Sequence, residues 1–160
     1  MPHVEKLRTL MFAIAQHPSV ENLGVSKLWS LVYSVEVAAL RELGASITGS
    51  KFFKYARGPV PGHGEELLRS MQCDRELRIV QRRDADGLQP LVSTLVTVPD
   101  VLSEAERTVI ERTCRALGGK SEQDLSQLIG EEPAWVMATE AGMLDPELLH
   151  YGRSVDPEGL

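Results

Sequence analysis

The 160-residue chain lacks several features that would mark its function directly. Only 5% of its residues are aromatic, and its two cysteines, Cys73 and Cys114, are far apart and define no disulfide framework. Its 17 Lys and Arg residues are outnumbered by 23 Asp and Glu, which gives a net charge of −6. This balance argues against a general nucleic-acid binder, which usually has a basic footprint, although it allows a local basic patch.

Long apolar runs are also missing. Because no stretch of about 18 apolar residues is present, the sequence predicts no transmembrane helix and no membrane partner. The first residues, M-P-H-V-E-K, are followed by no apolar segment, so no secretory signal is expected. Together with the sparse cysteines, these absences favour a reduced, cytoplasmic protein.

Recognisable catalytic and cofactor motifs are absent as well. The sequence has no P-loop, no dinucleotide-binding glycine motif and no nucleophile elbow. None of its four histidines has another histidine or a cysteine three or four residues away. The glycine-rich segment 58–64 lacks the lysine of a phosphate cradle, and Glu65 and Glu66 follow it and would repel phosphate. The sequence therefore predicts no cofactor, no metal and no enzymatic activity.

Apolar periodicity predicts an α+β domain that is mainly α-helical. Helices are expected over residues 4–17, 26–43, 65–73, 103–118, 121–129 and 133–142, with a last turn through Leu149. The helix at 26–43, with Ser26 as its N-cap, is apolar nearly all round, and we expect the other helices to surround it. We interpret residues 1–152 as a single domain and residues 153–160 as a flexible tail.

A small antiparallel sheet completes the predicted architecture. A hairpin is expected over residues 77–98, with its turn at 84–87. A short strand or extended loop is expected over residues 52–55. Residues 57–61 should form a rigid turn, because proline restricts φ and glycine permits unusual φ.

Glu36 is the most unusual charge, because it lies in the middle of the apolar helix. One interpretation is an acid that is paired or exposed at an edge. The other is a buried acid that pairs with Arg57 and fixes the turn at 57–61, since a buried charge needs a partner. A catalytic role is disfavoured, because the sequence shows no second carboxylate or nucleophile to act with it.

A basic cluster occupies the end of helix 65–73 and the hairpin. Its members are Arg75, Arg78, Arg82 and Arg83. A helix followed by a hairpin, with arginines on both, is typical of a winged-helix DNA reader. The alternative is a solvated surface whose arginines are balanced by neighbouring Asp and Glu residues, and those acids favour this second interpretation.

From Lys27 onward, a series of short motifs resembles one known family. The motifs are K-L-W-S-L-V-Y-S-V-E at 27–36, I-T-G-S-K-F-F-K at 47–54, G-P-V-P at 58–61, L-S-E-A-E at 102–106, G-G-K-S at 118–121, L-S at 125–126 and E-P-A-W at 132–135. In this order they are similar to the Panacea domain of the SocA-like antitoxins, over about residues 5–140. Two positions depart from the family pattern: Glu36 stands in place of an aspartate, and Gly130 in place of a histidine.

The resemblance implies a non-enzymatic antitoxin whose partner is a cognate toxin, neutralised most simply by direct binding. The residues that carry the family motif are Lys27, Glu36, Thr48, Gly49, Phe53, Gly58, Pro59, Glu132 and Pro133. Because aromatic and arginine side chains anchor many interfaces, the candidate partner-binding residues are Tyr33, Tyr55, Arg57 and Trp135. The alternative function is a DNA-binding transcriptional regulator that uses helix 65–73 and hairpin 77–98 as a winged-helix unit.

Overall fold

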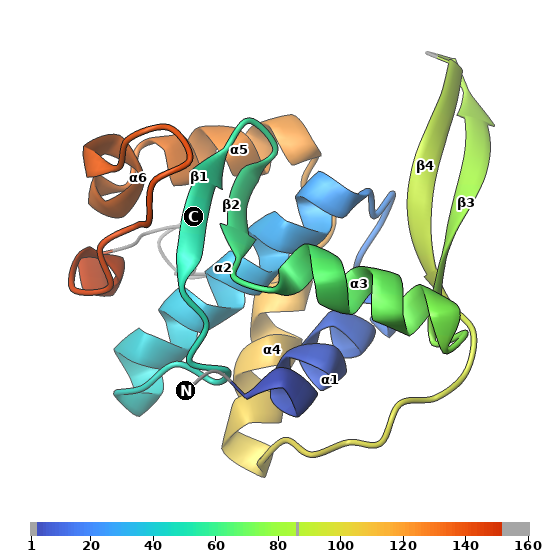
Figure 1. Ribbon diagram of the computed structural model, residues 1–160, viewed down its shortest axis with the longest axis horizontal. Helices are drawn as coiled ribbons and strands as arrows, with labels where there is room; N and C mark the ends of the chain where they lie inside the picture. Colours follow the sequence, from blue (N-terminus) through green and yellow to red (C-terminus); the bar gives the residue numbers. More distant parts are fainter. Residues whose placement is uncertain (1–2, 86, 152–160) are drawn as a thin grey trace.

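Helix α2 (Val25–Leu43) runs through the middle of the molecule (Figure 1). All of its residues from 27 to 39 are buried. Helices α1 (Val4–Gln16), α4 (Glu104–Leu117) and α5 (Glu122–Gly130) pack against it. The predicted central helix is confirmed, because a helix that is apolar on nearly every side is stable only when it is enclosed.

The computed structural model describes residues 3–85 and 87–151. The remaining elements are β1 (Phe52–Tyr55), β2 (Gly58–Pro61), α3 (Gly64–Cys73), β3 (Leu77–Asp84), β4 (Gly87–Thr94), α6 (Pro133–Met137) and a 3-10 turn at Leu148–Tyr151. Strands β1 and β2 form one antiparallel sheet, and β3 and β4 form a second. The predicted class, a mainly helical α+β fold, is confirmed, whereas the expected tail at 153–160 lies outside the described residues.

The β1–β2 hairpin is held on both sides. Strand β2 is buried along its whole length and packs on α2. The outer edge of β1 pairs with residues 141–144: the Lys54 N–H donates to the Gly142 carbonyl at 2.9 Å, and Phe52 accepts from the Leu144 N–H at 2.8 Å. This hairpin therefore has tertiary support on its face and along its outer edge.

The expectation of a rigid turn over residues 57–61 is wrong, because residues 58–61 form strand β2 and the turn lies at residues 56–57. Pro59 and Pro61 lie opposite Lys54 and Phe52. Those two β1 residues point their backbone groups away from β2, so the prolines sit where no amide is needed for the ladder.

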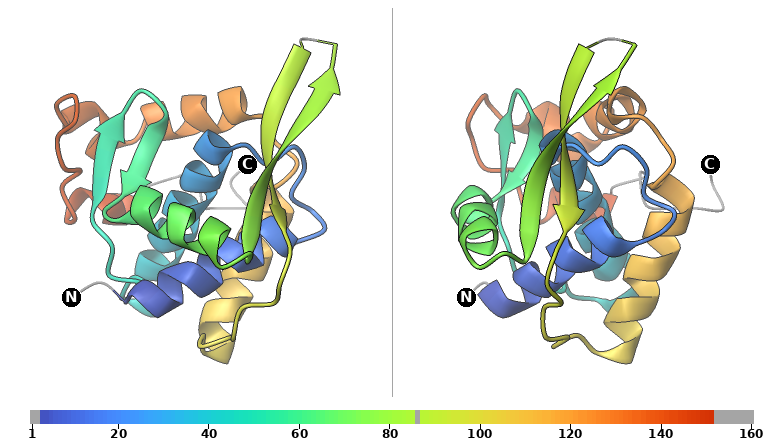
Figure 2. Two further views of the ribbon diagram at one scale, coloured as in Figure 1. Left: turned by 45° about the vertical axis from the view of Figure 1, so that its right-hand side comes forward. Right: turned by 90° about the vertical axis from the view of Figure 1, so that its right-hand side faces the viewer.

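The β3–β4 hairpin is anchored at its base and stands away from the body at its tip (Figure 2). Leu77 and Val92 are buried in the core, and the Val92 N–H donates to the Leu23 carbonyl at 2.6 Å. The Arg8 guanidinium bonds the Glu76 carboxylate at 2.6 Å and ties α1 to the start of β3. Nearer the turn, residues 80–83 of β3 and 87–90 of β4 are exposed.

The hairpin was expected to continue to residue 98, and this boundary is wrong. Strand β4 ends at Thr94, and the chain then crosses α1 as an extended segment (Figure 2). The Thr9 hydroxyl donates to the Pro99 carbonyl at 3.0 Å, and Val98 is buried in the core. The Leu95 and Val96 N–H groups still donate to the carbonyls of Glu76 and Arg75, and packing on α1 takes the chain away after them.

The predicted helix starts all lie within one residue of the observed starts. The capping box of Ser103 and Glu106 is present, and the Ser121 hydroxyl caps α5 by accepting the Asp124 N–H at 3.0 Å. The predicted N-cap Ser26 is wrong, because Gly24 takes that position and its carbonyl accepts the Leu28 N–H. Both confirmed caps are signals contained within four residues of sequence.

Helix α6 ends at Met137, five residues before the predicted end at Gly142. The Lys54 ammonium binds the carbonyls of Trp135 at 3.0 Å and Ala138 at 3.4 Å. Residues 141–144 then pair with β1. Contacts with a strand some eighty residues earlier in the chain therefore replace the last expected turns of the helix.

Candidate interaction surface

The polar residues of α2 tie loops to the central helix. The buried Lys27 ammonium donates to the carbonyls of Glu21 and Gly118, the latter at 2.6 Å. Burial lowers the pKa of Lys27, and the Glu21 carboxylate acts in the opposite direction. One side chain thus holds the α1–α2 loop and the α4–α5 loop together.

Glu36 is a paired, buried acid. Its carboxylate accepts the Ile47 N–H at 2.8 Å, the Thr48 N–H at 3.2 Å and the Thr48 hydroxyl at 2.7 Å. Burial raises the pKa of Glu36, while these hydrogen bonds oppose that increase. The predicted pair with Arg57 is wrong, because the carboxylate is used by residues 47–48 and Arg57 lies exposed at the β1–β2 turn.

Tyr33 is fully buried, which removes it from the candidate partner-binding residues. Its hydroxyl donates to the Glu132 carboxylate at 2.5 Å. Its ring meets the Phe52 ring edge-on, with centroids 5.3 Å apart. Burial and the adjacent Glu132 carboxylate raise the pKa of Tyr33, so its phenol keeps the proton that it donates. The periodicity of α2 did not show which aromatic would be enclosed by residues from the far end of the chain.

The remaining family-motif residues also serve the fold. Thr48 is buried between Glu36 and the Ser50 hydroxyl, at 2.7 Å from each. Gly49 and Gly58 have φ of +68° and +109°, a region that favours glycine. Pro133 begins α6, where the missing proline N–H costs no helical hydrogen bond.

Two of the candidate partner-binding residues lie exposed on the β1–β2 hairpin. Tyr55 is 44% exposed, and Arg57 occupies the turn. A cavity of about 720 Å³ extends from them to the first turns of α3 and is also lined by Phe53. A second cavity, of about 370 Å³, joins Arg57 to Pro90 on β4. Arg57 lines both cavities, so its side chain lies between the β1–β2 hairpin and strand β4.

Trp135 is half-buried and belongs to a different part of the surface. The Lys54 ammonium lies 4.9 Å from the centre of its ring. The neighbouring Val136 and Met137 are exposed. The structure therefore does not join Trp135 to the cavities at Arg57, although both regions flank strand β1.

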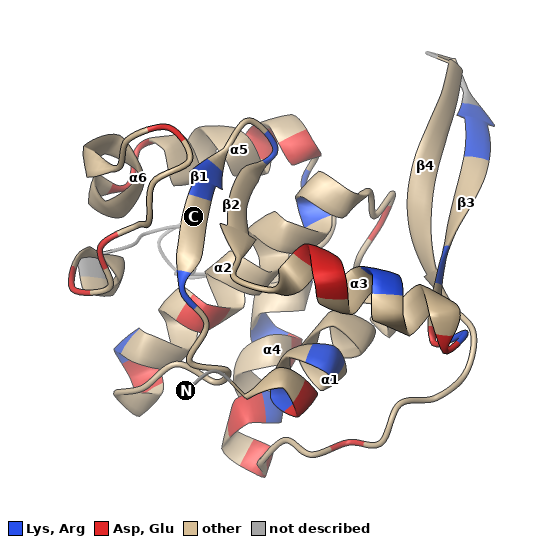
Figure 3. Cartoon of the chain, viewed as in Figure 1, with Lys and Arg blue, Asp and Glu red and all other residues tan. Residues whose placement is uncertain are grey.

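The basic cluster is solvent-exposed just before β3 and along that strand, and Figure 3 shows it beside the mixed charges of α3. Arg75, Arg78, Arg82 and Arg83 are all exposed. The first turn of α3, which precedes the hairpin, carries the exposed Glu65 and Glu66. Farther along α3 the exposed Arg69 continues the positive charge toward the hairpin, so the acidic residues of the helix are confined to its first turn.

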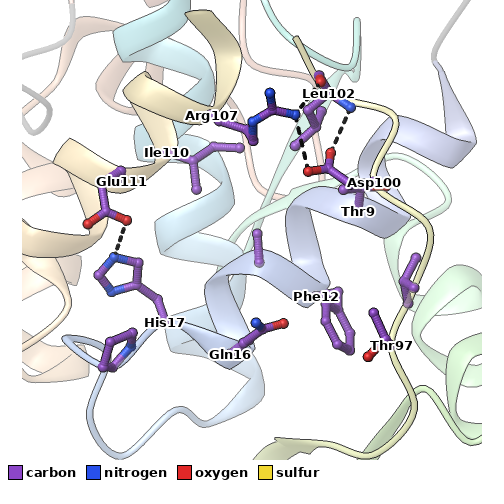
Figure 4. Close-up of a pocket in the computed structure, with 13 residues that line it drawn as sticks. Thr9, Phe12, Gln16, His17, Thr97, Asp100, Leu102, Arg107, Ile110 and Glu111 are labelled. Atoms are coloured by element: carbon purple, nitrogen blue, oxygen red, sulfur yellow. Dashed lines mark hydrogen bonds and ion pairs between the residues drawn. The ribbon is translucent and has the colours of Figure 1, made fainter. Parts of the chain in front are cut away.

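A third cavity, of about 440 Å³, lies between α1, α4 and the segment at 97–102 (Figure 4). Phe12 and Ile110 contribute apolar walls. At its edge, His17 Nε2 lies 2.6 Å from the Glu111 carboxylate, and its Nδ1 accepts the Ser19 N–H at 3.0 Å. Hydrogen bonding to His17 lowers the pKa of Glu111. Because both ring nitrogens have partners, we assign His17 a structural role.

The sequence did not indicate this cavity, since its walls come from three separated segments with no shared motif.

Within residues 3–85 and 87–151, no group of three His, Cys, Asp or Glu residues could hold a metal ion. No helix among those residues is long and apolar enough to cross a membrane. Cys114 is buried, and burial raises the pKa of its thiol to about 12, whereas Cys73 is exposed.

Comparison with known proteins identifies a family. The family model described as "Antitoxin SocA-like, Panacea domain" matches residues 28–136, which is more than half of the chain. No curated protein and no solved structure gives a significant match. The matched span runs from the central helix α2 to α6, and includes both hairpins and all the loops that Tyr33 and Glu36 hold. The chain therefore belongs to the SocA-like antitoxin family with a Panacea domain.

Proposed function

We propose that this protein is a cytoplasmic antitoxin that neutralises a cognate toxin by direct, stoichiometric and non-enzymatic binding. The family match over residues 28–136 carries the proposal. It names an antitoxin-like role, and binding is the simplest way for a small domain to block another protein.

The placement of the polar motif residues supports binding over turnover. Lys27, Tyr33 and Glu36 are buried, and each is hydrogen-bonded to another part of the same chain. A catalytic group must reach a substrate, and these side chains are enclosed. In this proposal, the family motif on α2 holds the surrounding loops in place and does not act on a substrate.

The surface between the hairpins supplies the binding residues in this proposal. Tyr55 and Arg57 are exposed beside two adjoining cavities, and such side chains often dominate interface energies. Trp135, with the exposed Val136 and Met137, forms a second contact region on α6. A toxin that covered both regions would lie across the β1 side of the molecule.

Co-expression with the product of the adjacent gene tests the proposal. We expect the neighbour alone to stop growth, the pair to restore it, and the two purified proteins to form a complex of fixed stoichiometry. A neighbour that is not toxic and forms no complex would contradict the antitoxin function.

Two surface variants locate the binding region. Tyr55→Ala and Arg57→Glu should each weaken the complex by at least about tenfold, which corresponds to about 1.4 kcal/mol. Arg41→Glu is the matched control, because Arg41 is exposed in the last turn of α2, away from both cavities. Equal affinities for all three variants would move the interface elsewhere on the surface.

A second candidate function is DNA binding by a winged-helix unit, favoured by the exposure of all four arginines of the basic cluster. It predicts a salt-sensitive mobility shift of DNA from upstream of the gene. Replacing Arg78 and Arg82 by alanine should then reduce both the affinity and its salt dependence. The absence of a shift at low salt would contradict this function.

A further inference from the structure

One long strand edge of the molecule faces solvent. In the antiparallel β3–β4 pair, residues alternate between positions bonded across the ladder and positions whose backbone groups point outward. The Val92 N–H points outward, since it donates to Leu23. Its opposite residue, Ile79, is therefore an outward position of β3, and so are Gln81 and Arg83 along the same strand.

The two edges of the hairpin differ. The β4 edge faces the body, where Val92 is bonded to Leu23 and Pro90 has no N–H to offer. The β3 edge faces away from the body in Figures 1 and 2. Among the described residues, the N–H and C=O groups of Ile79, Gln81 and Arg83 have no backbone partner outside the hairpin. A single edge therefore offers a row of hydrogen-bonding groups.

This open edge is well suited to accept another strand. Its residues 79–83 would present about 17 Å of extended backbone, at about 3.3 Å per residue. The base of the hairpin is fixed by the core residues Leu77 and Val92 and by the Arg8–Glu76 ion pair. The edge is thus already ordered, which reduces the entropy lost when a second strand binds.

The side chains beside the edge select the chemistry of the strand that could bind. Arg78 and Arg82 project on one face of the hairpin and Arg83 on the other, and all three are exposed. The Arg82 guanidinium also donates to the Asn22 amide oxygen at 3.5 Å, a solvent-exposed contact. Val80, between the first two, is 37% exposed. An added strand with acidic residues opposite the arginines and an apolar residue opposite Val80 would complement both faces.

The same charges disfavour other occupants. A second copy pairing through β3 would bring the arginines of two chains together, and like charges on paired strands are destabilising. DNA needs a wider basic surface than one strand, and the neighbouring α3 carries Glu65 and Glu66 as well as Arg69. An acidic polypeptide segment occupies the strand edge alone, where the flanking arginines attract it.

We propose that the outer edge of β3, residues 79–83, is a docking strand that pairs with an extended, acidic segment of the partner toxin. This inference rests on the proposed antitoxin function and adds the mode of recognition. The bound segment becomes a third strand of the β3–β4 sheet, held by main-chain hydrogen bonds and by ion pairs with the flanking arginines.

Gln81→Pro tests the edge directly. Proline at this outward position removes one N–H from the edge but none from the ladder, as Pro90 does directly across from it. Gln81→Ala is the control, because it removes the same side chain and keeps the amide. We expect Gln81→Pro to weaken binding of the purified neighbouring-gene product by at least tenfold and to lose growth rescue, and Gln81→Ala to keep both.

The outcomes separate this inference from the proposed function. If the wild type rescues growth and Gln81→Pro rescues equally well, the docking strand is wrong and the antitoxin function stands. If the wild type itself neither rescues nor binds, the antitoxin function fails and takes the inference with it. A dimer of the wild type that Gln81→Pro abolishes would assign the edge to self-association and overturn the inference.

Amide hydrogen exchange, measured by NMR with and without the neighbouring-gene product, provides a second readout. The amides of Ile79, Gln81 and Arg83 should exchange rapidly in the isolated chain and slow by at least tenfold in the complex. Those of Val80 and Arg82 are already bonded to β4 and should change little. Complex formation without added protection at the three outward amides would overturn the inference.

The charge requirement is tested separately. Arg82→Glu with Arg83→Glu should weaken the complex with the neighbouring-gene product, and the loss should shrink as salt is raised. A variant that binds as tightly as the wild type would exclude an acidic segment. Salt-sensitive binding to DNA that these changes abolish, with Gln81→Pro still active, would instead assign the arginines to nucleic acid.

Discussion

The two hairpins have the same local architecture and opposite surroundings. β1–β2 is packed on α2, and the segment at 141–144 closes its outer edge. β3–β4 is held at its base, and its tip and its β3 edge face solvent. Both are two-stranded antiparallel sheets. The rest of the chain, rather than the hairpin itself, therefore decides whether a strand edge is structural or available for binding.

Each hairpin also contains proline, and the positions follow one rule. Pro59 and Pro61 of β2 and Pro90 of β4 each occupy a position where the backbone groups point away from the paired strand. A proline there costs no hydrogen bond within the pair. Strand β2 can therefore be buried although it contains two prolines. In β4, Pro90 leaves the edge that faces the body without one N–H group.

The largest expected effect separates the interiors of the two hairpins. Phe52→Ala in β1 should lower the free energy of unfolding by about 3–5 kcal/mol, because it empties a fully enclosed site beside Tyr33. Leu88→Ala in β4, where the side chain is 61% exposed, should change it by less than about 0.5 kcal/mol. Urea denaturation followed by circular dichroism measures both, and similar losses would show that the second hairpin is packed in solution.

The next effect concerns the link between the embedded hairpin and the end of the chain. Tyr33→Phe removes the hydrogen bond to the buried Glu132 carboxylate and should cost about 1–3 kcal/mol. Tyr55→Phe deletes the same atom from an exposed ring and is the matched control, with a change close to zero. Equal unfolding midpoints for the two variants would show that the buried bond contributes nothing to stability.

A pH profile sharpens the comparison at Glu36, which holds the chain just before β1. Burial raises the pKa of this carboxyl above its ordinary value of 4.5, so the folded chain keeps the proton to higher pH than the unfolded chain. The resulting stability is complete below the unfolded pKa and is lost as the pH rises through the folded pKa. Relative to Glu36→Gln, the wild type should therefore lose stability as the pH rises above 4.5.

Urea denaturation of both proteins at several pH values gives that difference. If the wild type instead gains free energy of unfolding relative to Glu36→Gln as the pH rises, the three hydrogen bonds outweigh burial and the carboxylate is the preferred form.

The smallest effect tests which backbone groups of β3 are used. Val80→Pro removes an N–H from the ladder and should cost about 1 kcal/mol or more. Gln81→Pro removes only an outward N–H and should stay within about 0.5 kcal/mol of the wild type. Thermal and urea unfolding of the two neighbouring variants check this. A larger loss for Gln81→Pro would reverse the assignment of the open edge.

Several features were determined by the sequence alone, because their signals are local. The apolar circumference of α2 predicted its central position, and the Ser103–Glu106 capping box predicted the start of α4. Ser121 and Pro133 likewise identified the starts of α5 and α6. Each signal acts through residues within about one helical turn, so no distant contact is needed to interpret it.

Other features were decided only by the tertiary structure. The sequence could not show that Tyr33 would be enclosed by Glu132, or that Glu36 would bind residues 47–48 and leave Arg57 exposed. The early end of α6 depends on β1 in the same way. A buried polar group binds whichever partner the packed chain brings within about 3 Å. That choice depends on contacts up to about a hundred residues apart, which periodicity and local motifs do not encode.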